Sequence, residues 1–166
     1  KLTDETGTWV QAQANLLRVP EKADRGGVRF KKTDLDTGTP VAGAEISVYS
    51  TAQNDVVTDG ILRKKGEAAA VLITGEDGTC ETGADCLPFG TYFAVETKAA
   101  PGYEINREWR AEFTITGGGT ILDLTGEETV LKDRIIRGDL RLRKTDENGA
   151  PMPYVPFLII ALDGEG

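Results

Sequence analysis

Apolar and polar residues alternate with a period of two through much of this chain, a pattern that favours β-structure over helix. The clearest cases are residues 28–32, 44–48 and 109–115. Between such segments lie turn clusters rich in glycine and proline, among them DTGTP, LPFG, APGY and TGGG. The 20 Gly and 7 Pro gather largely in these clusters, which leaves little room for helices. The sequence therefore predicts an all-β fold, a Greek-key β-sandwich of short antiparallel strands.

A ten-residue string occurs twice, which predicts tandem domains. RGGVRFKKTD occupies residues 25–34, and RGDLRLRKTD begins 112 residues later, at 137–146. This spacing exceeds that of solenoid repeats and fits whole domains in series. We therefore expect one complete domain at 26–136, the end of a preceding domain at 1–25, and the first strands of a following domain at 137–166. Because two strands do not fold alone, we expect a longer polypeptide, with strand addition by another chain as the alternative.

Charge and composition exclude several classes of partner and chemistry. The formal net charge of -8 disfavours nucleic acid and anionic membranes as partners. No apolar run is long enough to span a bilayer, so we expect no membrane insertion within this segment. The absence of histidine from the sequence removes the usual nucleophile activation of hydrolases. We therefore expect no substrate-converting enzyme, no cofactor and no metal site.

Two cysteines, Cys80 and Cys86, lie close together in DGTCETGADCLPFG. Their spacing lacks the second pair of ligands that a zinc site requires. In a secreted protein such a pair closes a small disulfide loop, whereas in a cytosolic protein it would be two free thiols. We expect the disulfide.

A lysine occupies the apolar face of the first strand of the complete domain. Val28 and Phe30 mark that face, and Lys32 follows them with the same parity. The second copy of the string repeats the arrangement with Lys144. A lysine in a sandwich core is costly unless it is paired or neutral, although a lysine at a strand end can instead extend to solvent. Because the pattern occurs twice, we favour a buried lysine with a partner.

Two carboxylates are candidates to meet Lys32. Glu96 ends the strand TYFAVE on the face that carries its Tyr and Ala, and Asp133 shares a face with Leu131 in the last strand. A Greek-key sandwich brings its first and last strands side by side, so we expect Lys32 and Asp133 to lie opposite each other. The alternative for each carboxylate is an exposed charge at a strand end.

A lysine and two carboxyl groups in an apolar site have a specific chemistry. Away from water an amine loses its proton more readily, and a carboxylic acid keeps its own. A neutral amine can then attack the carboxyl carbon if a third group carries protons between them, a role that suits Glu96. The product is an amide between two side chains, formed once within one molecule with the loss of one water.

Three sequence blocks occur in order across residues 26–136: VRFKKTDLDTGTPVAGAEISVY, LPFGTYFAVETKAAPGY and VLKDRIIRG. Together they resemble the collagen-adhesin B-type (Cna-B) domain, also called the SpaA-type pilin domain, of Gram-positive surface proteins. The stretch YFAVETKAAPGY is similar to the E-box of that family, in which an aromatic-led strand ends in glutamate. The resemblance covers the whole of the expected complete domain.

This resemblance implies a β-sandwich of about seven strands, immunoglobulin-like or transthyretin-like, with an autocatalytic isopeptide bond. By position, the bond joins Lys32 to Asp133, with Glu96 as the catalytic residue. Most relatives carry asparagine as the acceptor and release ammonia, whereas an aspartate acceptor releases water. Lys144 would be the isopeptide lysine of the following domain, and the acceptor position of the preceding domain falls on Glu21.

These features predict a structural stalk or shaft module of a bacterial cell-surface adhesin or pilus. Its partners would be neighbouring domains of the same polypeptide and, for an adhesin, a host surface or matrix protein. The module would be extracellular and attached to the cell wall through an anchor outside this segment. One alternative is a ligand-binding module that uses residues 51–67, predicted as a loop with a turn of helix, and residues 75–90. The other is an accessory domain of an extracellular enzyme.

Overall fold

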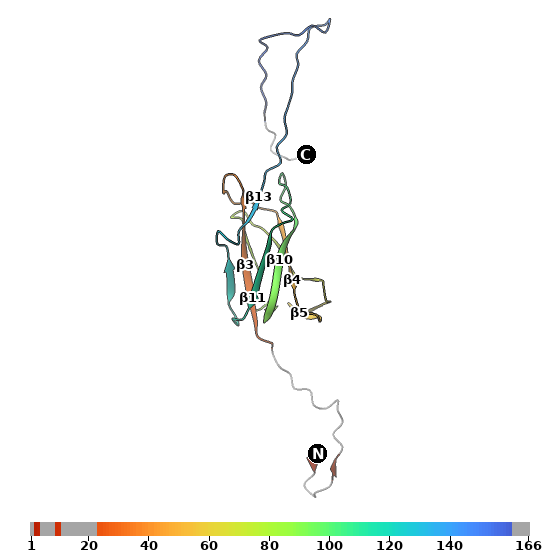
Figure 1. Ribbon diagram of the computed structural model, residues 1–166, viewed down its shortest axis with the longest axis vertical. Coiled ribbons are helices and arrows are strands. Elements are labelled where there is room, and N and C mark those ends of the chain that lie inside the picture. The colour runs from red at the N-terminus through yellow and green to blue at the C-terminus, as the bar shows by residue number, and fades with distance from the viewer. Residues whose placement is uncertain (1, 4–8, 11–22, 161–166) are drawn as a thin grey trace. The chain divides into compact units, whose positions relative to one another are not determined.

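The computed structural model describes residues 2–3, 9–10 and 23–160 of the chain (Figure 1). The regular secondary structure of these residues consists of β-strands without helices, as the alternating pattern predicts. The described residues include no helix that is long and apolar enough to cross a membrane. The chain divides into two units, residues 1–136 and 137–166.

Four antiparallel strands form the first sheet, in the order β11-β10-β4-β7. Their bounds are Glu45–Ser50 (β4), Ala68–Ile73 (β7), Gly90–Lys98 (β10) and Arg110–Ile115 (β11). Exposed and buried residues alternate strictly along β11, because one face of the strand lies on the core and the other faces solvent. β10 pairs with both β4 and β11, which makes it a central strand.

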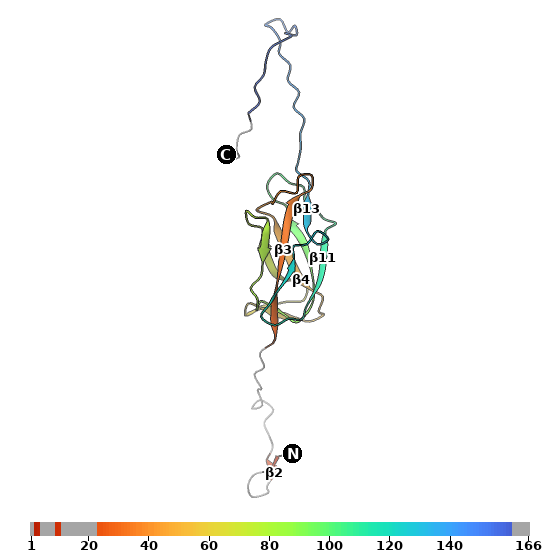
Figure 2. The same cartoon turned by 90° about the vertical axis from the view of Figure 1, so that its left-hand side faces the viewer.

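The second sheet is built around β3, which spans Arg25–Asp34. β8 (Thr79–Glu81) and β9 (Leu87–Pro88) pair with β3 in the antiparallel direction. β12 (Ile121–Leu124) and β13 (Leu131–Asp133) pair with it in the parallel direction, so the expectation of antiparallel strands throughout is wrong here. The chain reaches β12 by crossing over from β11 in the other sheet, and a crossover permits parallel pairing. Both views show β13 beside the end of β3 (Figures 1 and 2).

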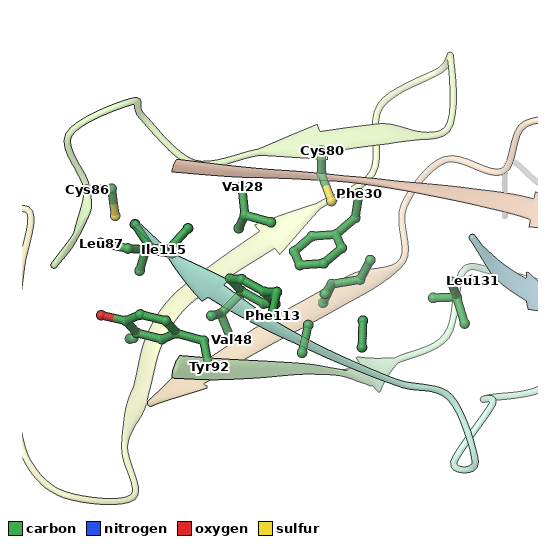
Figure 3. Packing of buried hydrophobic residues seen from close by; sticks show 14 residues of the cluster. Val28, Phe30, Val48, Cys80, Cys86, Leu87, Tyr92, Phe113, Ile115 and Leu131 are labelled. Atoms are coloured by element: carbon green, nitrogen blue, oxygen red, sulfur yellow. The ribbon is translucent and has the colours of Figure 1, made fainter. Parts of the chain in front are cut away.

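The two sheets bury their apolar faces against each other as a sandwich (Figure 3). Phe30 of β3 lies edge-on to Phe113 of β11, with 5.8 Å between the ring centroids, and Tyr92 of β10 stacks on the same ring at 5.8 Å. Burial of each large side chain stabilises the fold by about 1.5–3 kcal/mol. The cluster uses the alternate positions that the sequence pattern predicts: Val28, Phe30, Ile46, Val48, Tyr92, Ala94, Ala111, Phe113 and Ile115.

Residues 51–67 contain a β-hairpin, so the prediction of a loop with a turn of helix is wrong. β5 (Val56–Thr58) pairs with β6 (Ile61–Arg63) across a two-residue turn at Asp59 and Gly60. Both turn residues have positive φ, 47° and 73°, as a type I′ turn requires. Asp-Gly between two short apolar runs is a strong hairpin signal, and the sequence does carry it.

The predicted disulfide between Cys80 and Cys86 is wrong, because both cysteines are free and buried. β3 holds them apart: Cys80 pairs with Phe30, whereas Leu87, which follows Cys86, pairs with Gly26. Three to four residues of extended strand span about 10–13 Å, and a disulfide tolerates a Cα separation of only about 7 Å. Figure 3 shows the two sulfur atoms at different places in the core.

The first residues of the chain contain a short antiparallel pair of strands, β1 (Leu2–Thr3) and β2 (Trp9–Val10). The expected end of a preceding domain at 1–25 falls largely outside the described residues, as does its acceptor position, Glu21. That expectation stays a prediction.

Candidate functional site

Lys32 is 0% exposed and lies between two carboxylates inside the sandwich. Its Nζ donates to Oε1 of Glu96 at 2.9 Å and forms an ion pair with Oδ2 of Asp133. None of the three side chains is exposed to solvent. The structure thus brings together three residues that come from β3, β10 and β13 and lie far apart in the sequence.

The parallel pairing of β13 with β3 places Asp133 beside Lys32. Leu131 pairs with Lys32, and Asp133, two residues further along β13, has its side chain on the same face. Asp133 is 1% exposed and accepts no hydrogen bond of ordinary geometry from the described residues. The ion pair with Lys32 is therefore what offsets the cost of burying this carboxylate.

Both carboxylate oxygens of Glu96 are held by hydrogen bonds. Oε1 accepts from Lys32, and Oε2 accepts from the backbone N–H of Asn106 at 2.6 Å. Burial raises the pKa of Glu96 above its ordinary value, the bonds from Lys32 and Asn106 oppose this rise, and the neighbouring Asp133 adds to it. These opposed influences suit Glu96 to exchange a proton with its neighbours.

The backbone of Lys32 is fixed on both sides by hydrogen bonds. Its N–H donates to the carbonyl of Gly78 at 2.8 Å, and its carbonyl accepts from the N–H of Val41 at 3.2 Å. Gly78 has a φ of 74°, and a Cβ at that position would lie 2.4 Å from the carbonyl oxygen of Lys32. Only glycine permits this close approach, which fixes the direction in which the lysine enters the core.

The Thr-Asp pair that ends both copies of the repeated string closes a similar turn in each unit. Oδ1 of Asp34 accepts from the backbone N–H groups two and three residues later, at 2.9 and 2.8 Å. Oδ1 of Asp146 accepts from the N–H groups two and four residues later, at 3.0 and 2.8 Å. Aspartate favours such turns because its side chain bonds to backbone ahead of it. The repeated aspartate is therefore explained by local geometry.

Lys144, the predicted isopeptide lysine of the following domain, has different surroundings. Its side chain is exposed, and Nζ donates to the carbonyl of Thr145 at 2.9 Å and contacts Sδ of Met152 at 3.6 Å. Its assignment as a second cross-linking lysine stays a prediction.

The contacts of Lys32, Glu96 and Asp133 support condensation chemistry. An amine and a carboxyl group held in contact away from water need little further ordering to react, and Glu96 is in reach as a proton carrier. A hollow of about 470 Å³ opens beside Asp133, lined by Leu35, residues 104–108 and residues 132–134. Among the residues that the structure describes, no group of His, Cys, Asp and Glu side chains is arranged to hold a metal ion.

Sequence reasoning did not identify Asn106, although this residue contacts Glu96 directly. Its Oδ1 accepts from the N–H groups of Glu108 and Trp109, at 3.2 and 3.0 Å, in an Asx turn that leads into β11. Asparagine before a strand is a recognisable turn signal, but nothing in the sequence points to the bond between its backbone and Glu96.

One family model matches residues 26–128, which is well over half of the chain. It is the SpaA model, described as a prealbumin-like fold domain. No curated protein matches this sequence.

Several solved structures are similar to part of the chain. The T6 backbone pilin of serotype M6 Streptococcus pyogenes is 25% identical, covers 55% of this chain and 16% of its own, and has a TM-score of 0.42. The Bacillus anthracis TIE protein is 25% identical, covers 67% of this chain and 17% of its own, and has a TM-score of 0.48. A variant of BcpA, the major pilin subunit of Bacillus cereus, is 26% identical to this chain and has a TM-score of 0.45. The match covers 66% of this chain and 28% of the BcpA chain. This chain therefore spans between 16% and 28% of the length of these three proteins.

Proposed function

Because this chain belongs to the SpaA family of prealbumin-like fold domains, we propose that residues 26–136 form a stalk module of a Gram-positive surface pilus or adhesin. An amide between Lys32 and Asp133 closes the module, and Glu96 catalyses its formation. The chain acts on no separate substrate, since the reaction occurs once within each molecule.

The contact between Lys32 and Asp133 is the observation that carries this proposal. Both groups lie in the core, Lys32 at 0% and Asp133 at 1% exposure, and Nζ meets a carboxylate oxygen directly. A buried ion pair of this kind costs several kcal/mol per ion in desolvation, which attraction between the charges only partly offsets. An amide removes both charges, so condensation converts a costly arrangement into one that suits the core.

The reaction balances within the three side chains. The neutral amine of Lys32 attacks Cγ of the protonated Asp133 carboxyl, and a C–N bond forms as the C–OH bond breaks. Glu96 takes a proton from the attacking nitrogen and delivers a proton to the departing hydroxyl, which leaves as water. No oxidant, nucleotide or metal ion is required.

Such a bond would close a loop of 101 residues, from 32 to 133. By the chain-entropy argument used for disulfides, a loop of about 100 residues gives roughly 4–5 kcal/mol of stability. Under tension the bond would join the first and last strands covalently, so that force on the chain ends could not separate β13 from β3. Unlike a disulfide, it would be unaffected by reducing agents.

The repeated string supports the proposal that this module is one of several similar domains arranged in a row. A stalk is built from similar domains in a row, and the second copy forms a similar turn to the first. Its partners would then be neighbouring domains of the same polypeptide or neighbouring subunits, at the cell surface. The anchor to the cell wall would lie outside this segment.

Intact-mass measurement of the purified chain tests the cross-link. The wild type should be lighter than its sequence mass by one water, and Glu96→Ala should have its full calculated mass, because the proton carrier is gone. Glu112→Ala provides a matched control, since Glu112 is exposed on β11 and should leave the water loss unchanged. Proteolysis of the wild type should also release one branched peptide that contains both Lys32 and Asp133. A wild type of full mass would disprove the cross-link.

A further inference from the structure

The segment that follows β10 runs antiparallel to the chain around β13. The carbonyl of Gly102 accepts from the N–H of Ile136 at 2.8 Å, and the N–H of Glu104 donates to the carbonyl of Arg134 at 2.9 Å. An isolated antiparallel bridge lies between these two bonds. The segment therefore covers the edge of β13 that β3 does not occupy, and the spacing of its bonds defines the register of a short ladder.

The next bond of this ladder is made by a side chain in place of the backbone. The register calls for a bond from the N–H of Asn106 to the carbonyl of Lys132, but Nδ2 of Asn106 donates to that oxygen instead, at 3.0 Å. The backbone N–H thus released points to Oε2 of Glu96, at 2.6 Å. Meanwhile Oδ1 accepts from the N–H groups of Glu108 and Trp109, which fixes the orientation of the amide.

We propose that Asn106 is a positioning residue for the cross-linking reaction, because its side chain takes the place of its own backbone in the ladder and frees the N–H that orients Glu96. This inference rests on the proposed function. One residue thereby fixes the proton carrier on β10 and, through the carbonyl next to Asp133, the acceptor strand β13. Asparagine suits the position because its short side chain carries both a donor for the ladder and an acceptor for the turn.

A substitution that removes the side-chain amide of Asn106 should change the protonation of Glu96. The backbone N–H of residue 106 returns to the ladder, and Oε2 of Glu96 loses a donor that favours its ionised form. The charged groups that face Glu96 from the adjacent strands, Lys32 on β3 and Asp133 on β13, remain in place. Glu96 then keeps its proton to higher pH, so it accepts a proton from the lysine amine only at higher pH.

The test follows the formation of the cross-link in time. Full-length chain is made by cell-free translation and quenched in acid at intervals, and the fraction that has lost water is read by intact mass over a range of pH. Asn106→Ala and Asn106→Ser should cross-link about tenfold to a hundredfold more slowly, since small displacements of reacting groups have effects of that size. The acidic limb of their rate profile should also move to higher pH. Asn106→Ser keeps a side-chain oxygen that can accept the hydrogen bonds of the turn. It therefore tests the inference even if Asn106→Ala fails to fold.

Glu104→Ala serves as the matched control. Its backbone makes a ladder bond whatever its side chain, so its rate and pH profile should equal those of the wild type. Wild-type rates in both Asn106 variants would overturn the inference, and so would slower rates with an unshifted pH limb, since that result indicates general loosening. A wild type that never loses water would instead refute the proposed function, and with it this inference.

Discussion

Lys32 and Lys144 occupy the same position in two copies of one string, yet their surroundings differ. Both precede a turn that is closed by aspartate, with matching bridges between Thr33 and Pro40 and between Thr145 and Pro151. Lys32 lies within strand β3, whereas residues 137–144 form no strand. Lys32 is buried between two carboxylates, whereas Lys144 is exposed and bonds to groups of its own turn. The string alone therefore builds the turn, whereas the strand and the burial of the lysine require pairing with strands from elsewhere in the chain.

Lysine-to-alanine substitution at the two equivalent positions should give the largest contrast. Lys32→Ala removes the amine of the proposed cross-link and leaves two buried carboxylates without their cation, so the free energy of unfolding should fall by at least about 4 kcal/mol. Lys144→Ala should change it by no more than about 0.5 kcal/mol, as is usual for exposed sites. Denaturant unfolding monitored by fluorescence measures both. Equal losses in the two variants would show that burial of Lys32 contributes nothing special.

Thiol labelling extends the comparison from energy to opening of the core. Burial raises the pKa of both Cys80 and Cys86 to about 12, so in the folded domain they are protonated and shielded at pH 8. Labelling then requires opening of the domain, and a loss of about 4 kcal/mol should raise the open fraction in Lys32→Ala by roughly a thousandfold over the wild type. Iodoacetamide modification followed by mass spectrometry measures the rates.

A third thiol provides the reference for an open site. Leu142→Cys adds it to the second unit at a position that is exposed, and it should react at once in both backgrounds. If Cys80 and Cys86 of the wild type reacted as fast as this thiol, the burial of both cysteines would be contradicted.

The smallest contrast should come from the two aspartates that close the turns. Hydrogen bonds from the backbone and hydroxyl of Thr37 hold the pKa of Asp34 below its ordinary value. A lowered pKa stabilises the fold above the ordinary value, and this contribution is lost as pH falls towards the lowered one. Asp34→Ala should therefore weaken the loss of stability in acid, measured by thermal melting between about pH 5 and pH 2. Asp146→Ala should leave the melting temperature of the sandwich unchanged, because its turn belongs to the separate unit at 137–166. A similar effect in both variants would show that the turn, and not its setting in the sandwich, sets the response.

Much of the site could be predicted because burial follows parity along a strand. Lys32 shares parity with Val28 and Phe30, and Glu96 shares it with Tyr92, so their places on the inner face follow from alternation alone. Adjacency of the first and last strands follows from the topology of a sandwich. Where a pattern is local and periodic, sequence reasoning reaches the structure directly.

The remaining features depend on geometry that no local pattern encodes. The sequence shows Cys80 and Cys86 close together, but the pairing of β8 and β9 with different ends of β3 separates them. The parallel direction of β12 and β13 results from a crossover between sheets, which alternation cannot report. The role proposed for Asn106 depends on a ladder between segments that are distant in sequence, and those hydrogen bonds become visible only in three dimensions.

β3 pairs with β13, which lies much later in the sequence, and this pairing sets an order of events during synthesis. β3 leaves the ribosome first, but the acceptor strand follows it by 101 residues, which takes roughly 5–20 s at ordinary rates of translation. Pairing over such a separation is slow to nucleate, and until then Lys32 has no acceptor beside it. The proposed bond could therefore form only after β13 has docked, and it would serve as a chemical record that the newly made domain is complete.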